Sequence, residues 1–278
     1  MIFEFEESMK LHPTAVVHPG ANLAEDVEVG PYSIIGAHVT LGNGCVVGAH
    51  CVLEGHTTIG ENNRIHTGAA IGGAPQDLRY QGQETFLEIG NNNNFREYVT
   101  VNIGTVEGGR TTRIGNHVHI MAYSHIAHNC EIHDGVIIAN GGTLGGHVEI
   151  GEKAIVGGLV GIHQFVRVGK LSIIGGCSKL VQDAIPFATL DGHPARVYGL
   201  NLLGLKRAGI PNDIQQHLKH ALQFLFRSGL SRDAALERIE RECGESPEVL
   251  HLMDFVRRSE RGICTRVWGR EKEALWNE

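Results

Sequence analysis

The stretch 117–163 concentrates side chains that can do acid–base chemistry, because it holds seven of the 17 histidines in the chain. Histidine is well suited to act as a general base near neutral pH. A base beside a backbone N–H that can stabilise an oxyanion is what acyl transfer to a hydroxyl group requires. Imidazoles are also common zinc ligands, so a metal site is the alternative chemistry. The seven residues are His117, His119, His125, His128, His133, His147 and His163.

The spacing of these histidines predicts that several of them stand on one wall of a coil. If one coil takes about 18 residues, as the repeat described below predicts, then His128, Gly146 and Gln164 form one column. We therefore expect an imidazole, a backbone amide without a side chain and a carboxamide close together. The residues expected to flank this column are His147 and His163, each one residue away, and a second column of His125, Thr143 and Gly161.

A six-residue rhythm predicts the scaffold that positions this wall. A large apolar residue recurs at every sixth position from Leu11 to Ile71 and again at Ile89, Phe95 and Val101. A second register runs from Ile114 to Leu180, and glycine often follows the apolar residue. This pattern is typical of a parallel β-helix, in which each hexad forms a short strand and a turn. Three hexads make a triangular coil, and coils stack about 4.8 Å apart. We expect the aliphatic residues to point inward and the glycines to allow tight corners.

The rhythm is interrupted twice and fades after Leu180. The first interruption, residues 73–88, keeps the six-residue phase, whereas the second, residues 103–113, shifts it by one residue. Loops that leave a rigid scaffold often carry function. Residues 214–225 then place apolar side chains at helical spacing. We therefore predict a fold of the all-β plus α class, with a β-helix domain over 1–191 and a C-terminal helical domain with a polar tail over 192–278.

Composition and charge exclude several classes of protein. The chain has a net charge of −7 and no dense basic stripe, so we expect no nucleic-acid partner. No apolar stretch could span a bilayer and the N-terminus does not read as a signal peptide, so we expect no transmembrane segment and a cytoplasmic location. Residues 1–191 carry 10 Lys and Arg against 19 Asp and Glu, whereas residues 192–278 carry 14 against 12. The helical end is thus the better surface for an acidic partner.

Three short motifs give the chain a resemblance to a known family. HIAHNC at 125–130, GGAPQDLRY at 72–80 and IHQF at 162–165 closely resemble the UDP-N-acetylglucosamine acyltransferase family. The resemblance covers about residues 11–262 and implies a left-handed β-helix that forms a homotrimer. It implies that a 3-hydroxyacyl chain moves from acyl carrier protein to the 3-hydroxyl of UDP-N-acetylglucosamine, the first step of lipid A biosynthesis. It implies no metal and no cofactor, since the acyl donor is carried on the phosphopantetheine of the carrier.

The resemblance also implies roles for single residues. His128 matches the general base, and Gly146 matches the backbone donor to the oxyanion. Gly176 matches the position that bounds the acyl groove, and a glycine there implies a long acyl chain, of the fourteen-carbon rather than the ten-carbon class. The remaining matches are contacts to the sugar or the nucleotide, and they are Gln76, Asp77, His125, His147, His163, Gln164, Asn201 and Arg207.

Four positions depart from the family pattern. Asn129 follows the base where aspartate is common, so a carbonyl can orient the imidazole but no charge strengthens it. Arg79 stands where lysine is frequent. Leu203 and Ala208 replace a glutamate and an arginine that some relatives carry near the nucleotide. These departures bear on uridine recognition more than on the reaction.

Three alternatives remain open at this point. The sister UDP-sugar N-acyltransferase of the same pathway shares the scaffold, but we would expect an N-terminal uridine-binding domain, for which hexads beginning at Leu11 leave no room. A zinc-dependent hydratase of the γ-carbonic-anhydrase type would hold its metal between subunits of a trimer. A non-catalytic scaffold is the third. The sequence decides neither the exact acyl length nor whether the acceptor atom is oxygen or a 3-amino nitrogen.

Overall fold

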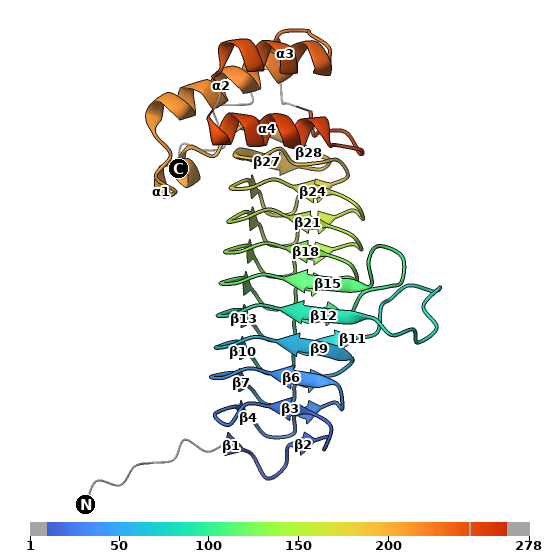
Figure 1. Ribbon diagram of the computed structural model, residues 1–278. Helices are drawn as coiled ribbons and strands as arrows, with labels where there is room; N and C mark the ends of the chain where they lie inside the picture. The colour runs from blue at the N-terminus through green and yellow to red at the C-terminus, as the bar shows by residue number, and fades with distance from the viewer. Residues whose placement is uncertain (1–9, 245, 266–278) are drawn as a thin grey trace, which may run out of the picture.

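The computed structural model describes residues 10–244 and 246–265 of the 278-residue chain. It is a long three-sided prism of stacked coils with a group of helices over one end (Figure 1). Residues 1–9 of the predicted β-helix domain, and residue 245 and the predicted tail from 266, lie outside the described residues.

Each side of the prism is one sheet, and successive strands pass from sheet A to sheet B to sheet C before the next coil begins. Sheet A contains β1 (Lys10–Leu11), β4 (Glu28–Val29), β7 (Val46–Val47), β10 (Arg64–Ile65), β13 (Asn94–Phe95), β16 (His119–Ile120), β19 (Ile137–Ile138), β22 (Ile155–Val156), β25 (Ile173–Ile174), β27 (Ala188–Gly192) and β28 (Ala195–Leu200). Sheet B contains β2 (Val16–Val17), β5 (Ile34–Ile35), β8 (Val52–Leu53), β11 (Ala70–Gly73), β14 (Thr100–Asn102), β17 (His125–Ile126), β20 (Thr143–Leu144), β23 (Gly161–Ile162) and β26 (Lys179–Leu180). Sheet C contains β3 (Asn22–Leu23), β6 (Val39–Leu41), β9 (His56–Ile59), β12 (Phe86–Ile89), β15 (Thr111–Ile114), β18 (Glu131–Ile132), β21 (Glu149–Ile150) and β24 (Arg167–Val168).

The core of the prism is the column of aliphatic side chains that the six-residue rhythm predicts. Ile126, Ile132 and Ile138 from three successive sheets are all buried. Leu11 is an exception, with 39% of its surface exposed, because it lies in the first coil that the structure describes. Burial of an aliphatic side chain contributes about 1.5–3 kcal/mol, so this repeated column supplies most of the driving force for coil stacking.

The glycines that follow the aliphatic residues have a different physical reason from the one we predicted. Apart from Gly72 (φ 85°), their backbone is not in the left-handed region, and a Cβ on Gly30 would lie 2.7 Å from the backbone of Gly48 in the next coil. Such a glycine is therefore required for close stacking of coils rather than for turning the chain. The left-handed position falls later in each corner and is often occupied by a residue other than glycine, such as Asn129 (φ 58°) or His147 (φ 61°).

The three edges of the prism are called here corner 1 (between sheets A and B), corner 2 (between B and C) and corner 3 (between C and A). Both interruptions of the repeat leave from corner 2 and project on the same side of the prism (Figure 1). Loop 1 comprises residues 74–85 and loop 2 comprises residues 103–110, shorter than the predicted 73–88 and 103–113 because β12 and β15 extend to four residues. Contacting residues lie 18 positions apart in regular coils, 30 across loop 1 and 25 across loop 2, which explains why only loop 2 shifts the phase.

The C-terminal part begins with a strand rather than a helix. Residues 195–200, which lie in the predicted helical domain, form β28 and pair antiparallel with β27. Helices α1 (Leu202–Arg207), α2 (Asn212–Arg227), α3 (Arg232–Glu242) and α4 (Pro247–Arg257) follow and cover this end of the prism (Figure 1). Ser246 caps α4 and Pro247 occupies its first turn, which is a favourable start for a helix. Across the described residues, every helix is too short or too polar to cross a membrane.

Candidate active site

The predicted wall of histidines lies at corner 2. His125, Thr143 and Gly161 are register partners on the adjacent strands β17, β20 and β23. Gly146 lies directly against the ring of His128, because a Cβ on Gly146 would be 2.6 Å from the His128 Cε1. The ring of His147 meets His128 edge-on with centroids 5.2 Å apart, and Phe165 stacks on His147 at 4.6 Å. Coil stacking therefore brings the imidazoles of His128 and His147 together at one corner.

The side chain of Asn129 determines which nitrogen of His128 carries the proton. The Asn129 Oδ1 accepts the Thr105 N–H at 2.9 Å, and its Nδ2 donates to the Thr105 and Gly108 carbonyls. Because a backbone N–H can only donate and a carbonyl can only accept, these contacts fix the orientation of the amide. The His128 Nδ1, 2.9 Å from the Asn129 Oδ1, must then be the donor. Its Nε2 consequently keeps a free lone pair, as a general base needs.

The backbone N–H of Gly146 is available beside this base. It makes no hydrogen bond to any residue that the structure describes. The same is true of the corresponding N–H groups of His128 and Gln164, so a free N–H is a property of this corner position in successive coils. Gly146 differs from His128 and Gln164 because it carries no side chain of its own and lies against the His128 ring. An acyl oxygen could therefore approach this donor while the acyl carbon lies near the His128 Nε2.

Burial favours the neutral form of the neighbouring imidazoles of His125 and His147. The pKa of His125 is lowered, first by burial and then by the nearby His128. The pKa of His147 is lowered by burial, by His128 and by Arg79. The His125 Nδ1 also shares a hydrogen bond of 2.7 Å with the Thr100 hydroxyl, which fixes its ring. Both side chains can therefore offer a sugar hydroxyl a hydrogen bond without placing a positive charge beside the base.

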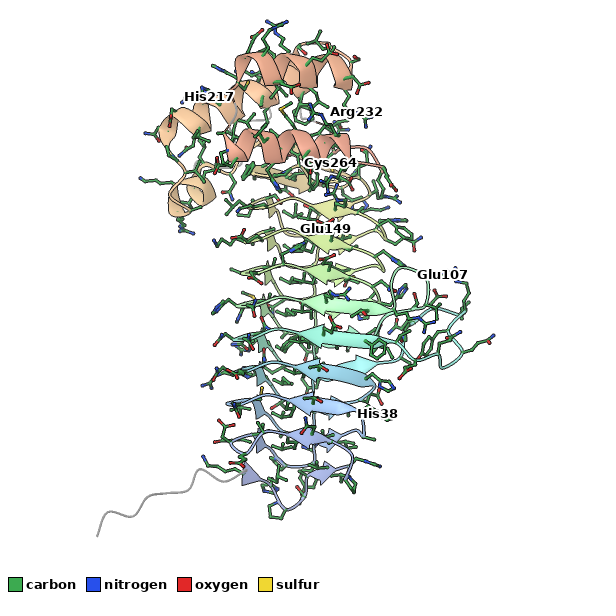
Figure 2. The ribbon with its side chains drawn as sticks, in the orientation of Figure 1. His38, Glu107, Glu149, His217, Arg232 and Cys264 are labelled. Atoms are coloured by element: carbon green, nitrogen blue, oxygen red, sulfur yellow. The ribbon has the colours of Figure 1, made fainter. Side chains whose placement is uncertain are left out.

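Loops 1 and 2 are joined to each other above this wall. Arg79 of loop 1 forms ion pairs with Asp77 in its own loop, at 2.8 Å, and with Glu107 of loop 2. Glu107 lies at the projecting side of the prism in Figure 2. The hydrogen bonds from Arg79 hold the pKa of the Asp77 carboxyl well below its ordinary value. Asp77 therefore stays ionised, while Gln76 beside it is exposed.

The other predicted site residues are divided among the three corners. His163 and Gln164 are exposed at corner 2. Gly176 lies at corner 1, where it stacks on Gly158. Asn201 is buried near corner 3, where its Nδ2 donates to the Leu171 carbonyl and its Oδ1 caps α1. Arg207 is exposed at the end of that helix. A single chain thus brings together only part of the predicted set.

Sequence reasoning missed the residues of loop 2 that contact the wall. Thr105 bonds to Asn129, and Gly108, with φ of 89°, packs against His147 so closely that any side chain there would overlap the ring. The adjacent glycines Gly108 and Gly109 were the available signal, since paired glycines mark a backbone that makes a close approach. Within the described residues, no group of three His, Cys, Asp or Glu side chains is arranged to hold a metal ion.

Comparison with known proteins gives consistent results along the chain. Residues 111–146 match the family model for the bacterial transferase hexapeptide, and residues 183–264 match that for domain 2 of UDP N-acetylglucosamine O-acyltransferase. A protein of Thiobacillus denitrificans named "Acyl-[acyl-carrier-protein]--UDP-N-acetylglucosamine O-acyltransferase" is 51% identical over 91% of this chain and 98% of its own. A protein of the same name from Burkholderia orbicola is 47% identical, with the same coverage.

Solved structures extend this likeness to three dimensions. The structure of LpxA from Acinetobacter baumannii has a TM-score of 0.90 and 43% identity, and covers 91% of this chain and 99% of its own. A UDP-N-acetylglucosamine acyltransferase from Campylobacter jejuni has a TM-score of 0.87 and 38% identity, and covers 93% of this chain and 100% of its own. These matches confirm the predicted left-handed parallel β-helix with a C-terminal helical part. The chain therefore belongs to the acyl-carrier-protein-dependent UDP-N-acetylglucosamine O-acyltransferase family.

Proposed function

We propose that this protein transfers a 3-hydroxyacyl chain from acyl carrier protein to the 3-hydroxyl of UDP-N-acetylglucosamine. The family membership supports the reaction class. The observation that carries the assignment of residues is the arrangement of His128 and Gly146. A base with a free Nε2 lies directly beside a glycine whose backbone N–H has no hydrogen-bond partner within the described residues.

These two groups are sufficient for a direct transfer. The His128 Nε2 removes the proton of the sugar hydroxyl as that oxygen attacks the thioester carbonyl carbon. The carbonyl oxygen becomes an oxyanion that accepts a hydrogen bond from the Gly146 N–H. When the intermediate collapses, the carbon–sulfur bond breaks and the carrier's thiolate takes the proton from the His128 imidazolium. The products are the ester and the free phosphopantetheine thiol, and the route requires no cofactor, no metal and no acyl-enzyme.

A homotrimer would bring the divided site residues together. A substrate that reaches both His128 and Gly176 must span corners 2 and 1, which are different edges of one prism. Three-fold association can place corner 1 of one subunit beside corner 2 of the next at three equivalent interfaces. Corner 1 carries exposed apolar side chains suited to such an interface, namely Tyr98, Tyr123 and Leu159, which are 50%, 67% and 69% exposed.

The acidic carrier protein is proposed to dock against the helical end. Lys219 and Arg227 line a cavity of about 360 Å³ between β28 and α2. Lys206 and Arg207 lie in the last turn of α1. All four side chains are exposed. They belong to the part of the chain whose charge balance favours an acidic partner, and they can pair with carboxylates on a carrier.

The comparisons favour the O-acyltransferase over the sister N-acyltransferase, the zinc hydratase and the scaffold. Location in the cytoplasm remains a prediction.

The test of function is mass spectrometry of the product formed from UDP-N-acetylglucosamine with a panel of 3-hydroxyacyl carrier proteins. An ester at the sugar 3-position is expected, and absence of any acylated sugar across the panel would refute the proposal.

A further inference from the structure

The side chain of Asn129 makes contacts in two directions. Its Oδ1 accepts from the His128 Nδ1 and from the Thr105 N–H, both at 2.9 Å. Its Nδ2 donates to the carbonyls of Thr105, at 3.3 Å, and Gly108, at 3.1 Å. One of these four contacts reaches the base, and the other three reach the backbone of loop 2. Asn129 thus links loop 2 to His128, the proposed base.

The contacts of loop 2 require an amide rather than a carboxylate. A carboxylate could still accept from His128 and from the Thr105 N–H. Its second oxygen, however, would face the Thr105 and Gly108 carbonyl oxygens, to which it cannot donate. The two carbonyls would lose their partner and the like partial charges would repel. The common family residue at this position, aspartate, is therefore mismatched to the loop 2 of this chain.

The loop that Asn129 holds also touches the second imidazole. Gly108 accepts the Asn129 amide and packs against the ring of His147. His147 in turn stacks between this contact and Phe165. Displacement of Gly108 would therefore loosen the ring that faces His128. One amide side chain controls the orientation of both imidazoles, directly for His128 and through the loop backbone for His147.

We propose that Asn129 is a positioning residue that fixes loop 2 over His147 while it holds the proton of His128 on Nδ1, and that this enzyme needs an amide there. The proposal rests on the proposed role of His128 as the base. According to this proposal, Asn129→Asp lowers the activity of this chain, even though the negative charge of the carboxylate would make His128 a stronger base.

The test compares Asn129→Ala and Asn129→Asp with the control Asn92→Ala. Asn92 has the same left-handed backbone, with φ of 58°, but is exposed and makes no side-chain hydrogen bond within the described residues. We expect Asn129→Ala to lower kcat/KM about 10- to 100-fold, since a base displaced by about 1 Å costs about that much. We expect Asn129→Asp to be slower than wild type throughout, with the acidic limb of its pH profile moved to higher pH, because a carboxylate stabilises the imidazolium.

Hydrogen exchange gives a readout that does not depend on turnover. In both Asn129 variants the backbone of residues 103–110 should exchange faster than in wild type, and in Asn92→Ala it should not. An Asn129→Asp variant with wild-type turnover and wild-type protection of loop 2 would overturn the proposal. An acidic limb of the Asn129→Asp pH profile that stays at the wild-type pH would also overturn the proposal, because it would show that residue 129 does not interact with the base.

A double variant separates this proposal from the proposed function. In a His128→Ala background, adding Asn129→Ala should cause little further loss of turnover, because the residue acts through the base. An equal loss in both backgrounds would show a general structural role and refute positioning. If His128→Ala alone keeps the wild-type rate, the proposed mechanism fails, whereas the exchange data still report whether Asn129 fixes the loop.

Discussion

Replacing Gly146 by alanine tests the proposed site at its narrowest point. The backbone of Gly146 lies outside the left-handed region, so alanine is compatible with the local conformation. The new methyl carbon would lie 2.6 Å from Cε1 and 2.7 Å from Nε2 of His128. Ordinary contact needs about 3.4 Å or more, so the imidazole must move by about 1 Å. That movement stretches the hydrogen bond from His128 to Asn129, and the methyl group occupies space between the His128 ring and Gly146.

We expect the Gly146→Ala variant to lose about 10²–10³-fold in kcat. Displacement of a reacting group by about 1 Å costs about 10²-fold, and loss of one oxyanion donor costs about 10²–10³-fold. This corresponds to about 2.7–4 kcal/mol of transition-state stabilisation. The two effects have one cause, so they should not add in full. The melting temperature should change little, because only one side chain has to shift.

The assay is initial-rate release of the carrier thiol with UDP-N-acetylglucosamine as acceptor. Asn92→Ala is the control, because Asn92 is exposed at corner 3 and makes no side-chain hydrogen bond within the described residues. This control should keep the wild-type rate. A Gly146→Ala variant that is folded and within about threefold of wild type would refute the assignment, since neither the base nor the N–H could then be used as proposed.

Four further predictions address other parts of the molecule. His128→Ala should lower turnover about 10²–10⁴-fold while the protein stays folded, and a near wild-type rate would exclude His128 as the base. Gly176→Met should shift donor preference from fourteen-carbon toward ten-carbon chains. A Cβ at Gly176 would meet only the backbone of Gly158, 3.3 Å away at its carbonyl oxygen, so a methionine side chain fits and would block a path in which each buried methylene contributes about 0.8 kcal/mol. Equal loss of activity with both donors would show that Gly176 does not set the acyl length. The apparent affinity for acyl carrier protein should fall as salt rises from about 0.1 to 1 M and should fall in Lys219→Glu at low salt, and indifference to both would contradict docking at the helical end. His133→Gln should destabilise the protein to denaturant near pH 5.5 and have little effect near pH 8.5. The Glu149 carboxylate, 3.7 Å from the His133 Nε2, raises the pKa of His133, so the stabilisation is complete below about 6.5 and is lost as pH rises through the raised value; a difference independent of pH would refute this.

The sequence by itself determined the scaffold of this protein. A strict period of six needs only local information, because each hexad repeats the same choice between an inward aliphatic residue and an outward polar one. The stacking of His125 on Thr143 follows from that period, since no loop intervenes between them. The histidine motifs likewise indicated the family, because they keep their residue types and their spacing.

The tertiary structure alone decided how the loops meet the wall. Thr105 and Asn129 are 24 residues apart, which is neither the 18 residues of a regular coil nor the 25 residues of the coil that contains loop 2. Their hydrogen bonds, and hence the tautomer of His128, depend on the path of the loop backbone. The period also could not reveal that the glycine after each aliphatic residue serves coil stacking, nor that Asn201 caps a helix near corner 3 while His128 lies at corner 2. A repeat fixes which residues share a column, whereas contacts between columns, loops and helices depend on packing in three dimensions.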